Sequence, residues 1–404
     1  MQYHAHALAA NGVRVDLVGL EGTPLPRAIA EDPRITVHRV RPSTFRRHTA
    51  RVGVAYAFVA LVDAACLSMR LWRALRTLDR PTLVLVQNPP EFPTMLVAWM
   101  ALRRRGVRFV IDWHNLGYTV LRLRLGHWHP AVRLARWFER RDARRVDANL
   151  TVSRSLAVFL DSRFGVKQAA VLYDRPASVF APIERADREQ YRQALFTRFG
   201  IRGAVVGFIV CPTSWTEDED FDVIIEAVGR LEERIRGWEA AAPMRRFADL
   251  VILVTGDGTR RAEFERRFAG LPARRVHLRT RWLEPEDYPR IVGSADLGLC
   301  LHRSSSGLDI PMKIADLFGA GVPVCALDYG ACLAERVRHG DNGLLFSKAE
   351  QLTDVLFDLF ETFPADQKRL DRLRAGARKS ARPTWEEGWV REARPVLLPG
   401  AGAP

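Results

Sequence analysis

Short apolar runs alternate with longer amphipathic segments along almost the whole chain. Runs of strand length, rich in valine, isoleucine and leucine, occur at Val13–Gly19, Ile35–Val40, Leu83–Gln87, Arg108–Asp112, Ala148–Val152, Ala169–Tyr173, Val205–Cys211, Leu250–Thr255, Val276–Leu278, Leu297–Leu301, Pro323–Ala326 and Gly343–Phe346. Most of them are separated by segments in which apolar residues recur at helical spacing. Alternation of strand and helix predicts parallel sheets that are covered by helices on both faces.

This alternation occurs twice, once before about residue 180 and again after about residue 203. The polar, proline-containing stretch "DRPASVFAPIERADREQYRQALFTRFGIRG" lies between and predicts a linker and a helix. A chain of 404 residues also suits two domains better than one core. We therefore predict an α/β protein with two doubly wound domains facing a cleft. The expected boundaries are 1–180, a linker and helix at 181–202, a second domain at 203–382, and a C-terminal helix and tail at 383–404 that packs back on the first domain.

The beginning of the sequence departs from this plan. "MQYHAHALAANG" predicts a helix that ends at Asn11 and Gly12, followed by the strand "VRVDLVGL". A doubly wound domain normally begins with a strand. The first domain is therefore expected to lack its first strand.

Positive charge is concentrated in the first half of the chain. The net charge is +14, and residues 1–180 hold 28 Lys and Arg against 13 Asp and Glu, whereas the remainder holds 33 against 34. This asymmetry predicts an anionic partner for the first half, such as a lipid surface, a polyphosphate or a nucleic acid. Genomic bias toward arginine is the alternative, because 56 of the 61 basic residues are arginine. Bias alone would not remove acidic residues from the first half.

The hydropathy of the chain contains no run of 18 apolar residues, so the sequence predicts no spanning helix and no signal peptide. The nearest candidate, Val52–Leu67, has basic residues at both ends. It predicts either a helix lying in a membrane interface or a buried domain helix. Five scattered cysteines show no zinc-type spacing and read as reduced thiols.

Polar clusters end two strands of the first domain. Gln87 and Asn88 end one strand, and "DWHN" ends another with Asp112, His114 and Asn115. Cleft chemistry is expected at the carboxyl ends of parallel strands. His114 is a candidate general base, because imidazole titrates near neutral pH, or it hydrogen-bonds a substrate hydroxyl. Asp112 is a rival base, or it only orients the loop.

Polar loops also follow strands of the second domain. Thr213 and Ser214 can present hydroxyl and N–H groups to a phosphate at the start of a helix. The acidic run Glu217–Asp220 formally matches a DxD metal motif, but acids in the first turn of a helix are ordinary complements of its dipole, which we favour. The sequence therefore predicts phosphate binding at this loop and no metal.

Two further strand ends are candidate donor contacts. Gly256 and Gly258 flank Asp257 in a tight turn whose backbone could border a phosphate, although a lone GxG is weak evidence. Arg281 and Trp282 lie in a loop that could bind the edge of a nucleobase. No nucleic-acid-binding motif accompanies these residues.

The most unusual segment is "HRSSSGLDIPMKIADLFGAGVPV", which begins at His302. Its loop residues Ser304, Ser305, Ser306 and Gly307 are expected to cap a helix, with Pro311 in the first turn. Within that helix Asp309, Lys313 and Asp316 fall on one polar stripe, either facing the cleft or forming a solvated face with one Asp–Lys pair. Because the helix is otherwise apolar and leads into a buried strand, we favour the cleft.

Together these motifs resemble those of the chitobiosyldiphosphodolichol β-mannosyltransferases of the endoplasmic reticulum, which have the GT-B fold. The matching stretches are "LVQNPP", "IDWHN", "NLTVS", "VLYDRPAS", "TSWTEDEDF", "RWLEPEDYP", "SSSGLDIPMKIADLFG" and "DNGLLF", in order along nearly the whole chain. The resemblance implies inverting transfer of mannose from GDP-mannose to GlcNAc₂-diphosphodolichol on the cytosolic face of the membrane. The expected product has a β-1,4 linkage, and the expected site has no metal and no cofactor.

The resemblance also implies residue roles. His114 or Asp112 would take the proton of the acceptor, and Lys313 with the Ser304–Gly307 loop would stabilise the leaving diphosphate. Gln87, Asn88 and Asn115 would bind the acceptor. Asp316 stands where related GT-B enzymes carry a ribose-binding carboxylate. Leu308 replaces the first glutamate of their usual pair, so the role of its neighbour Asp309 stays open.

The implied partners are an anionic membrane surface and, as a further class, other mannosyltransferases of the same pathway. Family members usually carry an N-terminal anchor before the first segment of this chain, so a truncated product is one expectation. Two rival readings stay open. One is a retaining GT-B transferase with a soluble acceptor, and the other is an inactive fragment acting as a basic membrane-associated scaffold.

Overall fold

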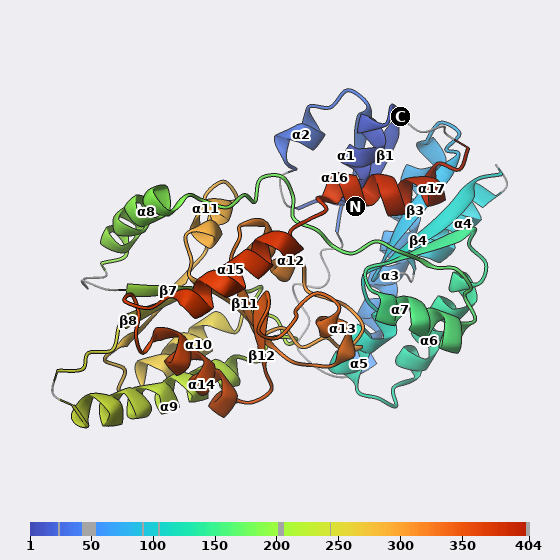
Figure 1. Ribbon diagram of the computed structural model, residues 1–404. Helices are drawn as coiled ribbons and strands as arrows, with labels where there is room; N and C mark the ends of the chain where they lie inside the picture. The colour runs from blue at the N-terminus through green and yellow to red at the C-terminus, as the bar shows by residue number, and fades with distance from the viewer. Residues whose placement is uncertain are drawn as a thin grey trace. The chain divides into compact units, whose positions relative to one another are not determined.

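The computed structural model describes residues 1–22, 25–42, 54–90, 93–103, 106–200, 206–242 and 244–400, and it describes no side chains at 54–61. The chain divides into two compact units, which are described one at a time (Figure 1). The first unit comprises Met1–Val152, Leu156–Leu172 and Trp389–Pro404. The second unit comprises Ser153–Ser155 and Tyr173–Gly388.

The first unit contains two parallel sheets. Its strands are β1 (Val15–Leu20), β2 (Ile35–Val40), β3 (Leu83–Asn88), β4 (Arg108–Trp113), β5 (Ala148–Thr151) and β6 (Ala170–Val171). Strands β1 and β2 pair with each other, and β3 to β6 form a second sheet in sequence order. Within the described ranges no ladder joins β1 to β3, so the sheet predicted for this unit is divided in two.

Helices of the first unit flank these sheets. They are α1 (Gln2–Ala10), α2 (Arg27–Ala30), α3 (Val54–Thr77), α4 (Thr94–Leu102), α5 (Gly117–Leu125), α6 (Pro130–Ala143), α7 (Arg154–Phe159), η3 (Leu160–Phe164), η4 (Trp389–Ala393) and α17 (Arg394–Leu397). The helix predicted at the start of the chain is confirmed, because α1 ends at Ala10, Asn11 is its C-cap and Gly12 follows with φ of 80°. Glycine tolerates that left-handed backbone without strain.

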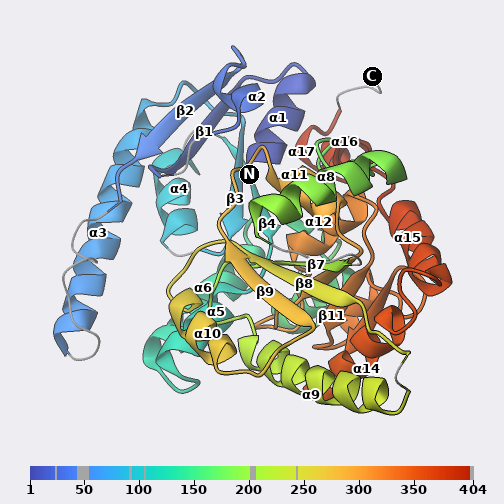
Figure 2. The ribbon, with the colours of Figure 1, turned by 90° about the vertical axis from the view of Figure 1, so that its left-hand side faces the viewer.

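The apolar segment predicted at 52–67 lies in the long helix α3, which packs against α4 (Figure 2). Residues 52 and 53 lie outside the described ranges. From Val62 to Leu67 the helix side chains are mostly half-buried, and the exposed positions farther on include Arg70, Arg73 and Arg76. Among the described helices none is both long enough and apolar enough to cross a membrane.

The second unit is a six-stranded parallel sheet in the order β12-β11-β10-β7-β8-β9. Its strands are β7 (Val206–Pro212), β8 (Asp249–Thr255), β9 (Val276–Arg281), β10 (Leu297–Cys300), β11 (Val324–Leu327) and β12 (Gly343–Phe346). The chain runs outward from β7 to β9 and then returns to β10 on the other side of β7. The reversal of strand order therefore falls between β7 and β10, which is where open parallel sheets bind ligands.

Two layers of buried side chains hold this sheet between helices. Its helices are α8 (Arg185–Arg198), α9 (Phe221–Ala240), α10 (Arg261–Ala269), α11 (Tyr288–Gly293), α12 (Met312–Gly319), α13 (Ala331–Ala334), α14 (Ala349–Phe360), α15 (Lys368–Ser380) and α16 (Trp385–Gly388). Along β7, Ile209 packs with α9 and α14, whereas Phe208 and Val210 pack on the opposite face with α11 and α12. Alternate residues of a strand point to opposite faces, so a fully apolar strand is covered on both.

All the strands predicted from the sequence are present, and the prediction of an α/β protein with parallel sheets is confirmed, although there are three sheets and not two. The reason is that buried parallel strands have continuous apolar runs, which are easy to recognise. Strand ends shifted by up to three residues, as at the end of β9, because the last ladder bond depends on the neighbouring strand.

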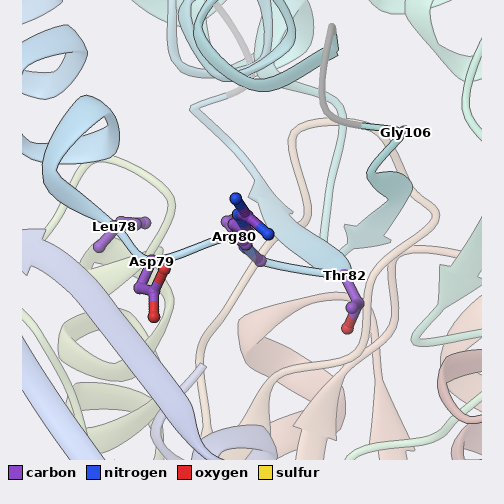
Figure 3. A pocket seen from close by; sticks show the side chains of 6 residues that line it. Leu78, Asp79, Arg80, Thr82 and Gly106 are labelled. Atoms are coloured by element: carbon purple, nitrogen blue, oxygen red, sulfur yellow. The ribbon is translucent and has the colours of Figure 1, made fainter.

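A hollow of about 590 Å³ lies beside the first unit's sheet, lined by Leu78–Thr82 and Gly106 (Figure 3). Its lining residues come just before β3 and β4, at the amino ends of those strands. Ligands in parallel sheets bind at the opposite, carboxyl ends. This hollow is therefore separate from the candidate sites below.

Candidate functional site

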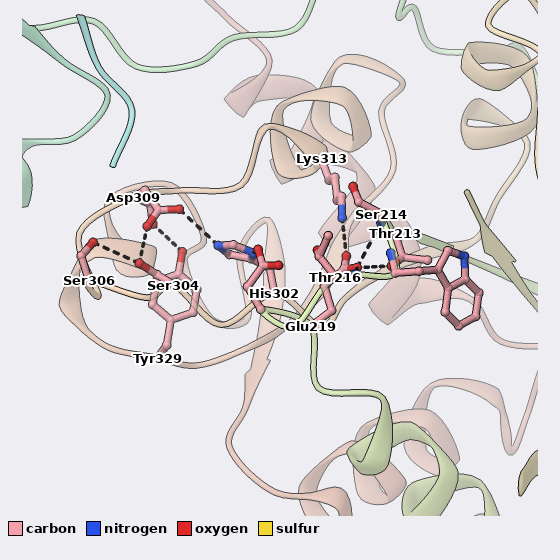
Figure 4. Close-up of polar contacts among 12 residues, drawn as sticks. Thr213, Ser214, Thr216, Glu219, His302, Ser304, Ser306, Asp309, Lys313 and Tyr329 are labelled. Atoms are coloured by element: carbon pink, nitrogen blue, oxygen red, sulfur yellow. Dashed lines mark hydrogen bonds and ion pairs between the residues drawn. The ribbon is translucent and has the colours of Figure 1, made fainter. Parts of the chain in front are cut away.

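The loops that follow β7 and β10 meet at the reversal point of the second unit's sheet. Backbone hydrogen bonds join them: Arg303 N–H donates to the Asp218 carbonyl at 2.7 Å, and Asp220 N–H donates to the Leu301 carbonyl at 3.0 Å. The side chains of both loops converge on the same place (Figure 4). Residues that are far apart in the sequence thus form one polar site.

Glu219 is the centre of the β7 loop. Its carboxylate is buried and accepts hydrogen bonds from the Thr213 hydroxyl and from the Ser214 N–H, the latter at 3.0 Å (Figure 4). The Lys313 ammonium forms an ion pair with its other oxygen. Three residues predicted to bind phosphate are thus held by one carboxylate that the sequence analysis did not single out. Ser214 remains exposed, so its hydroxyl faces solvent.

His302 lies between two carboxylates. Its Nδ1 is 3.0 Å from Asp218 Oδ2, and its Nε2 is 3.2 Å from Asp309 Oδ2. Burial acts to lower the pKa of His302, but hydrogen bonds and charge from the two carboxylates outweigh it and raise the pKa to about 9. Hydrogen bonding from His302 in turn lowers the pKa of Asp218. The imidazole is therefore a cation at neutral pH.

The serine loop binds its own backbone. Ser304 Oγ accepts from the Gly307 N–H at 2.8 Å, and Ser306 Oγ accepts from the Leu308 N–H at 3.1 Å. Helix α12 begins only at Met312, with Pro311 as its N-cap and no side-chain cap. The predicted serine caps of the helix are therefore wrong. The serines, including Ser305 between them, instead shape the loop ahead of it.

Asp309 lies before α12 and not on it, so the prediction that Asp309 shares a helical stripe with Lys313 and Asp316 is also wrong. Its carboxylate, which is 8% exposed, accepts from the Ser304 hydroxyl and contacts His302. Its carbonyl accepts a hydrogen bond from the Tyr329 hydroxyl at 2.8 Å (Figure 4). Asp309, whose role was open, ties the loop together.

Asp316 is on α12 and faces helix α11. Burial, followed by the nearby charge of Asp174, raises the pKa of Asp316 to about 7, while a hydrogen bond from the Tyr288 hydroxyl opposes the rise. A carboxylate with such a pKa exists in both forms near neutrality. Its ability to accept hydrogen bonds from a ligand therefore changes with pH.

The glycine turn after β8 packs against the β7 loop. A Cβ on Gly256, whose φ is +97°, would lie 2.0 Å from the Thr213 carbonyl, and one on Gly258 would lie 2.6 Å from Trp215 Cβ. Both glycines are thus required for close backbone packing, which supports the Thr213 loop from behind. Arg281, at the end of β9, and the adjacent Trp282 are exposed, Trp282 by 54%.

The first unit contains a different polar cluster, at the end of β4. Asp112 is 2% exposed, and its Oδ2 lies 2.9 Å from His114 Nε2 and 3.2 Å from Nε2 of His4 on α1. Burial acts to raise the pKa of Asp112, yet the two imidazoles hold it well below its ordinary value. The carboxylate is therefore ionised and its Oδ2 is shared by two imidazoles, while the His114 side chain is 23% exposed.

The candidate acceptor residues lie around the same loop. Asn88 is fully buried, and its amide donates to Glu139 Oε1 at 3.0 Å and to the Asn115 carbonyl at 3.1 Å. Asn115 Oδ1 accepts from the Leu116 N–H at 2.7 Å. These contacts make Asn88 and Asn115 braces of the His114 loop, whereas Gln87 in β3 is half-buried.

Glu139 on α6 is a buried acid beneath this loop. Its Oε1 also accepts from the Gly117 N–H at 2.6 Å, and within the described parts of the chain its Oε2 has no hydrogen-bond partner. Burial raises the pKa of Glu139 to about 7, against the hydrogen bonds that lower it. A Cβ on Gly117 would lie 2.9 Å from Oε1, so this contact needs glycine.

The acidic run 217–220 precedes α9. Asp220 is the N-cap of α9 and accepts from Val223 N–H at 3.4 Å, whereas Asp218 and Glu219 form the ion pairs already described. The expectation that all four acids occupy the first turn is therefore wrong. Over the described ranges no group of three or more His, Cys, Asp or Glu side chains has the geometry to hold a metal ion.

Sequence reasoning did not single out four residues that organise these clusters: Glu219, His302, Tyr288 and His4. A signal existed for two of them, because His302 directly follows a buried strand and Glu219 is the middle acid of the run after another. No local signal marks His4, since its partner Asp112 is more than a hundred residues away. Long-range pairs of this kind become visible only in the fold.

Two family models match the chain. Residues 1–173 match the glycosyl transferase 4-like domain, and residues 208–362 match glycosyl transferases group 1. The chain is 34% identical to a mouse protein named chitobiosyldiphosphodolichol beta-mannosyltransferase, over 98% of this chain and 86% of that protein. The human protein of the same name is 33% identical, over 98% and 89%.

The chain belongs to the chitobiosyldiphosphodolichol beta-mannosyltransferase family. It is thus a glycosyltransferase. An Arabidopsis thaliana protein named UDP-glycosyltransferase TURAN is also 34% identical to the chain, over 98% of this chain and 94% of its own length.

Solved structures agree on the GT-B fold. Sucrose-phosphate synthase from Thermosynechococcus elongatus is similar with a TM-score of 0.67 at 14% identity, covering 95% of this chain and 88% of that one. Anabaena HepE with UDP and glucose has a TM-score of 0.61 at 15% identity, covering 91% and 94%. The parallel sheets of the two units are therefore the Rossmann-like sheets of a GT-B enzyme.

Proposed function

We propose that this glycosyltransferase moves mannose from GDP-mannose to GlcNAc₂-diphosphodolichol, with inversion at the anomeric carbon and a β-1,4 linkage in the product. The observation that carries the proposal is alignment over 98% of the chain with mannosyltransferases named for this acceptor. The two polar clusters support it with chemistry that the reaction needs, namely a cation beside a leaving group and a candidate base.

The donor belongs to the second unit in this proposal. The diphosphate binds where the β7 and β10 loops meet, because Lys313 supplies a positive charge there and Ser214 is exposed beside it. The Ser304–Gly307 loop borders the anion site on the other side, with its Gly307 N–H held by Ser304 Oγ. Positive charge and fixed N–H dipoles stabilise a leaving diphosphate more in the transition state than in the ground state.

Glu219 prepares Lys313 for that role. One oxygen of its carboxylate contacts the Lys313 ammonium, and the other accepts a hydrogen bond from the Thr213 hydroxyl. Glu219 therefore fixes the positions of both Lys313 and the Thr213 loop at the phosphate site. Asp316 binds the ribose hydroxyls, with Tyr288 holding the carboxylate in place. Arg281 and Trp282 are exposed next to Gly256 and contact the base of the nucleotide.

His114 is the proposed general base of the first unit. Its imidazole accepts the proton of the acceptor 4-hydroxyl as that oxygen attacks the anomeric carbon. The bond from this carbon to the donor phosphate breaks at the same time, and GDP leaves with the bonding electrons. No covalent intermediate is needed for a single displacement with inversion. Asp112 is buried and contacts both His4 and His114. It therefore orients His114 and balances the positive charge that forms on this imidazole.

The identity of the donor nucleotide can be tested by competition. The Arabidopsis relative is named a UDP-glycosyltransferase, and the HepE structure contains UDP, whereas we propose GDP-mannose as the donor. We expect GDP to compete with labelled GDP-mannose at least tenfold better than UDP. If GDP and UDP compete equally well, GDP-mannose is not the specific donor, although the enzyme can still transfer mannose.

The acceptor is carried on a lipid, and the surface of α5 and α6 fits a membrane. Its exposed apolar side chains are Leu123, Trp128, Leu134 and Trp137, with Trp128 exposed by 86%. Arg124, Arg133, Arg136 and Arg140 are exposed among them, whereas the acids Glu139 and Asp142 are buried. Tryptophan and arginine together are typical of surfaces that bind anionic lipid headgroups. We place the enzyme on the cytosolic face of the endoplasmic reticulum through this surface.

Flotation with vesicles tests the α5–α6 surface. The chain should float with vesicles that contain phosphatidylserine and much less with pure phosphatidylcholine. Replacing Trp128 and Trp137 with Ala should reduce flotation, because two interfacial anchors are lost. Replacing exposed Trp282 of the second unit with Ala is the matched control. An equal loss in that control would remove the surface from the proposal.

The activity itself is tested with labelled GDP-mannose and a GlcNAc₂-diphospho-lipid. Release of the product sugar by β-mannosidase is the expected result. A product released only by α-mannosidase would favour the retaining alternative with its different stereochemistry. Absence of any product, with an active human family member alongside, would favour the inactive scaffold.

A further inference from the structure

A line of buried side chains connects helix η4 to the proposed base. Trp389 Nε1 lies 3.0 Å from His4 Nδ1, His4 Nε2 lies 3.2 Å from Asp112 Oδ2, and the same oxygen lies 2.9 Å from His114 Nε2. Trp389, His4 and Asp112 are 0%, 3% and 2% exposed. Residues from both ends of the first unit's sequence thus meet behind the strand β4.

The indole determines where His4 carries its proton. The indole nitrogen of Trp389 can only donate a hydrogen bond, so His4 Nδ1 must accept and is unprotonated. The single ring proton of His4 is therefore on Nε2, directed at the carboxylate of Asp112. A second proton on Nδ1 would place two N–H groups against each other in a buried site. His4 is thus a neutral donor with a fixed tautomer.

The carboxylate determines the tautomer of His114 in the same way. An ionised carboxylate can only accept, so His114 must present its Nε2–H to Asp112 Oδ2. The lone pair of neutral His114 is then on Nδ1. Because Asp112 Oδ2 already receives the proton of His4, its position and charge are fixed before any substrate arrives.

We propose that Trp389 and His4 are positioning residues that, through Asp112, make Nδ1 of His114 the atom that accepts the acceptor's proton. This inference rests on the proposed function, in which His114 is the base. The acceptor O–H bond breaks, its proton moves to Nδ1, and the resulting imidazolium is balanced by Asp112, while His4 keeps its own proton. In the described part of the chain, Asp112 and His4 are titratable groups on this side of His114, and Glu139 holds the loop at Gly117.

Tautomer measurement tests the inference without any substrate. Long-range ¹⁵N–¹H spectra of histidine-labelled protein distinguish protonated from bare ring nitrogens among the ten histidines, with His114→Gln and His4→Gln used for assignment. At neutral pH we expect a proton on Nε2 and none on Nδ1 in both His4 and His114. A wild-type His114 with its proton on Nδ1 would overturn the proposal.

Two variants connect the tautomer to turnover. In Trp389→Phe the His4 tautomer is no longer fixed, so we expect a mixed signal at His4 and a fall in kcat of about tenfold, with the KM for GDP-mannose unchanged. In His4→Leu the carboxylate loses one donor, and the acidic limb of the kcat–pH profile should move. His4→Gln, which retains an N–H toward Asp112, should keep kcat within about threefold of wild type.

Trp385→Phe is the matched control, because buried Trp385 loses the same volume and the same indole N–H in the neighbouring helix α16. An equal fall in kcat in Trp385→Phe and Trp389→Phe, with unchanged tautomers, would show a packing effect and overturn the proposal. If Trp389→Phe fails to fold, the inference is decided by two other measurements. These are the tautomers of wild-type protein and the kcat values of His4→Gln and His4→Leu. If wild type transfers no mannose, the proposed function fails, whereas the tautomers are still measured.

Discussion

The two units each hold an imidazole–carboxylate cluster at the carboxyl ends of their strands, with opposite stoichiometry. In the first unit one carboxylate, Asp112, is shared by two imidazoles, His4 and His114. In the second unit one imidazole, His302, is shared by two carboxylates, Asp218 and Asp309. The residue types are the same, and the numbers of imidazoles and carboxylates are exchanged.

The different numbers of carboxylates around the two histidines indicate which of them can accept a proton during catalysis. Two carboxylates raise the pKa of His302 to about 9, so this ring holds its proton and acts as a fixed cation between two loops. His114 shares one carboxylate with a second imidazole, and its side chain is 23% exposed, so a substrate can approach it. His114 therefore fits a base that accepts a proton during turnover, whereas His302 fits a brace of the donor loops.

The largest expected effect is on His114. Replacing it with Ala removes the proposed base, so kcat should fall by about 10²- to 10⁴-fold while the Kd for GDP stays within threefold of wild type. Turnover with labelled GDP-mannose and calorimetry with GDP measure the two quantities. His302→Asn is the matched variant of the other cluster, and it should weaken GDP binding more than His114→Ala does. The reverse pattern would exchange the roles of the two histidines.

Lys313 gives the next largest effect. Lys313→Met removes the cation beside the leaving diphosphate, so kcat should fall by about 10²-fold. Glu219→Gln keeps a side chain that can bind the Thr213 loop but no longer neutralises the ammonium. This second variant should retain GDP binding better than Lys313→Met. If Glu219→Gln is the more damaging of the two for GDP affinity, Lys313 only satisfies a buried acid and does not bind the donor.

The pH dependence of stability distinguishes the clusters more finely. The folded-state pKa of His302, about 9, is above the ordinary value near 6.5, so its stabilisation is complete below about pH 6.5 and is lost as pH rises through 9. We expect the free energy of unfolding to fall by about 1–3 kcal/mol between pH 6.5 and 9. Urea unfolding at both pH values measures this fall, and His302→Asn should reduce it. If the free energy of unfolding of His302→Asn falls as much as that of wild type between pH 6.5 and 9, the interpretation of His302 as a fixed cation is contradicted.

The smallest expected effect concerns Asp316. Because burial raises the pKa of this carboxyl to about 7, its ionised form increases as pH rises from 6 to 8. Ribose hydroxyls donate to the ionised form, so GDP should bind up to about tenfold more tightly at pH 8 than at pH 6. Calorimetry across this range with Asp316→Asn checks the assignment. A variant with the same pH slope as wild type would remove Asp316 from the ribose site.

Much of the fold could be predicted from hydrophobic periodicity. The apolar runs identified every strand of the three sheets. They are clearest in β7 and β8, which are buried on both faces and therefore almost wholly apolar. The strand order could not be predicted, and neither could the division of the first unit's strands into two sheets. Strand pairing depends on which strand edges meet in the folded chain. The sequence of β1 does not indicate that β2 is its neighbour.

Candidate site residues were predicted less completely. His114, Asp112, Thr213, Lys313 and Asp316 were recognised because each lies at or just after a strand end or on a polar stripe. The expected helical stripe was wrong at Asp309, because Pro311 delays the helix until Met312. A shift of three residues at the start of a helix changes every partner upstream of it.

The sequence by itself determined the family, the parallel α/β architecture and the polar strand ends, because these depend on short-range patterns that survive without knowledge of contacts. Only the tertiary structure decided how the polar residues are shared: Glu219 with Lys313, Asp218 and Asp309 with His302, and Trp389 with His4. Ionisation and tautomers depend on distances of about 3 Å and on exclusion of water. Such distances join residues up to 385 positions apart, and a linear pattern contains no information about them.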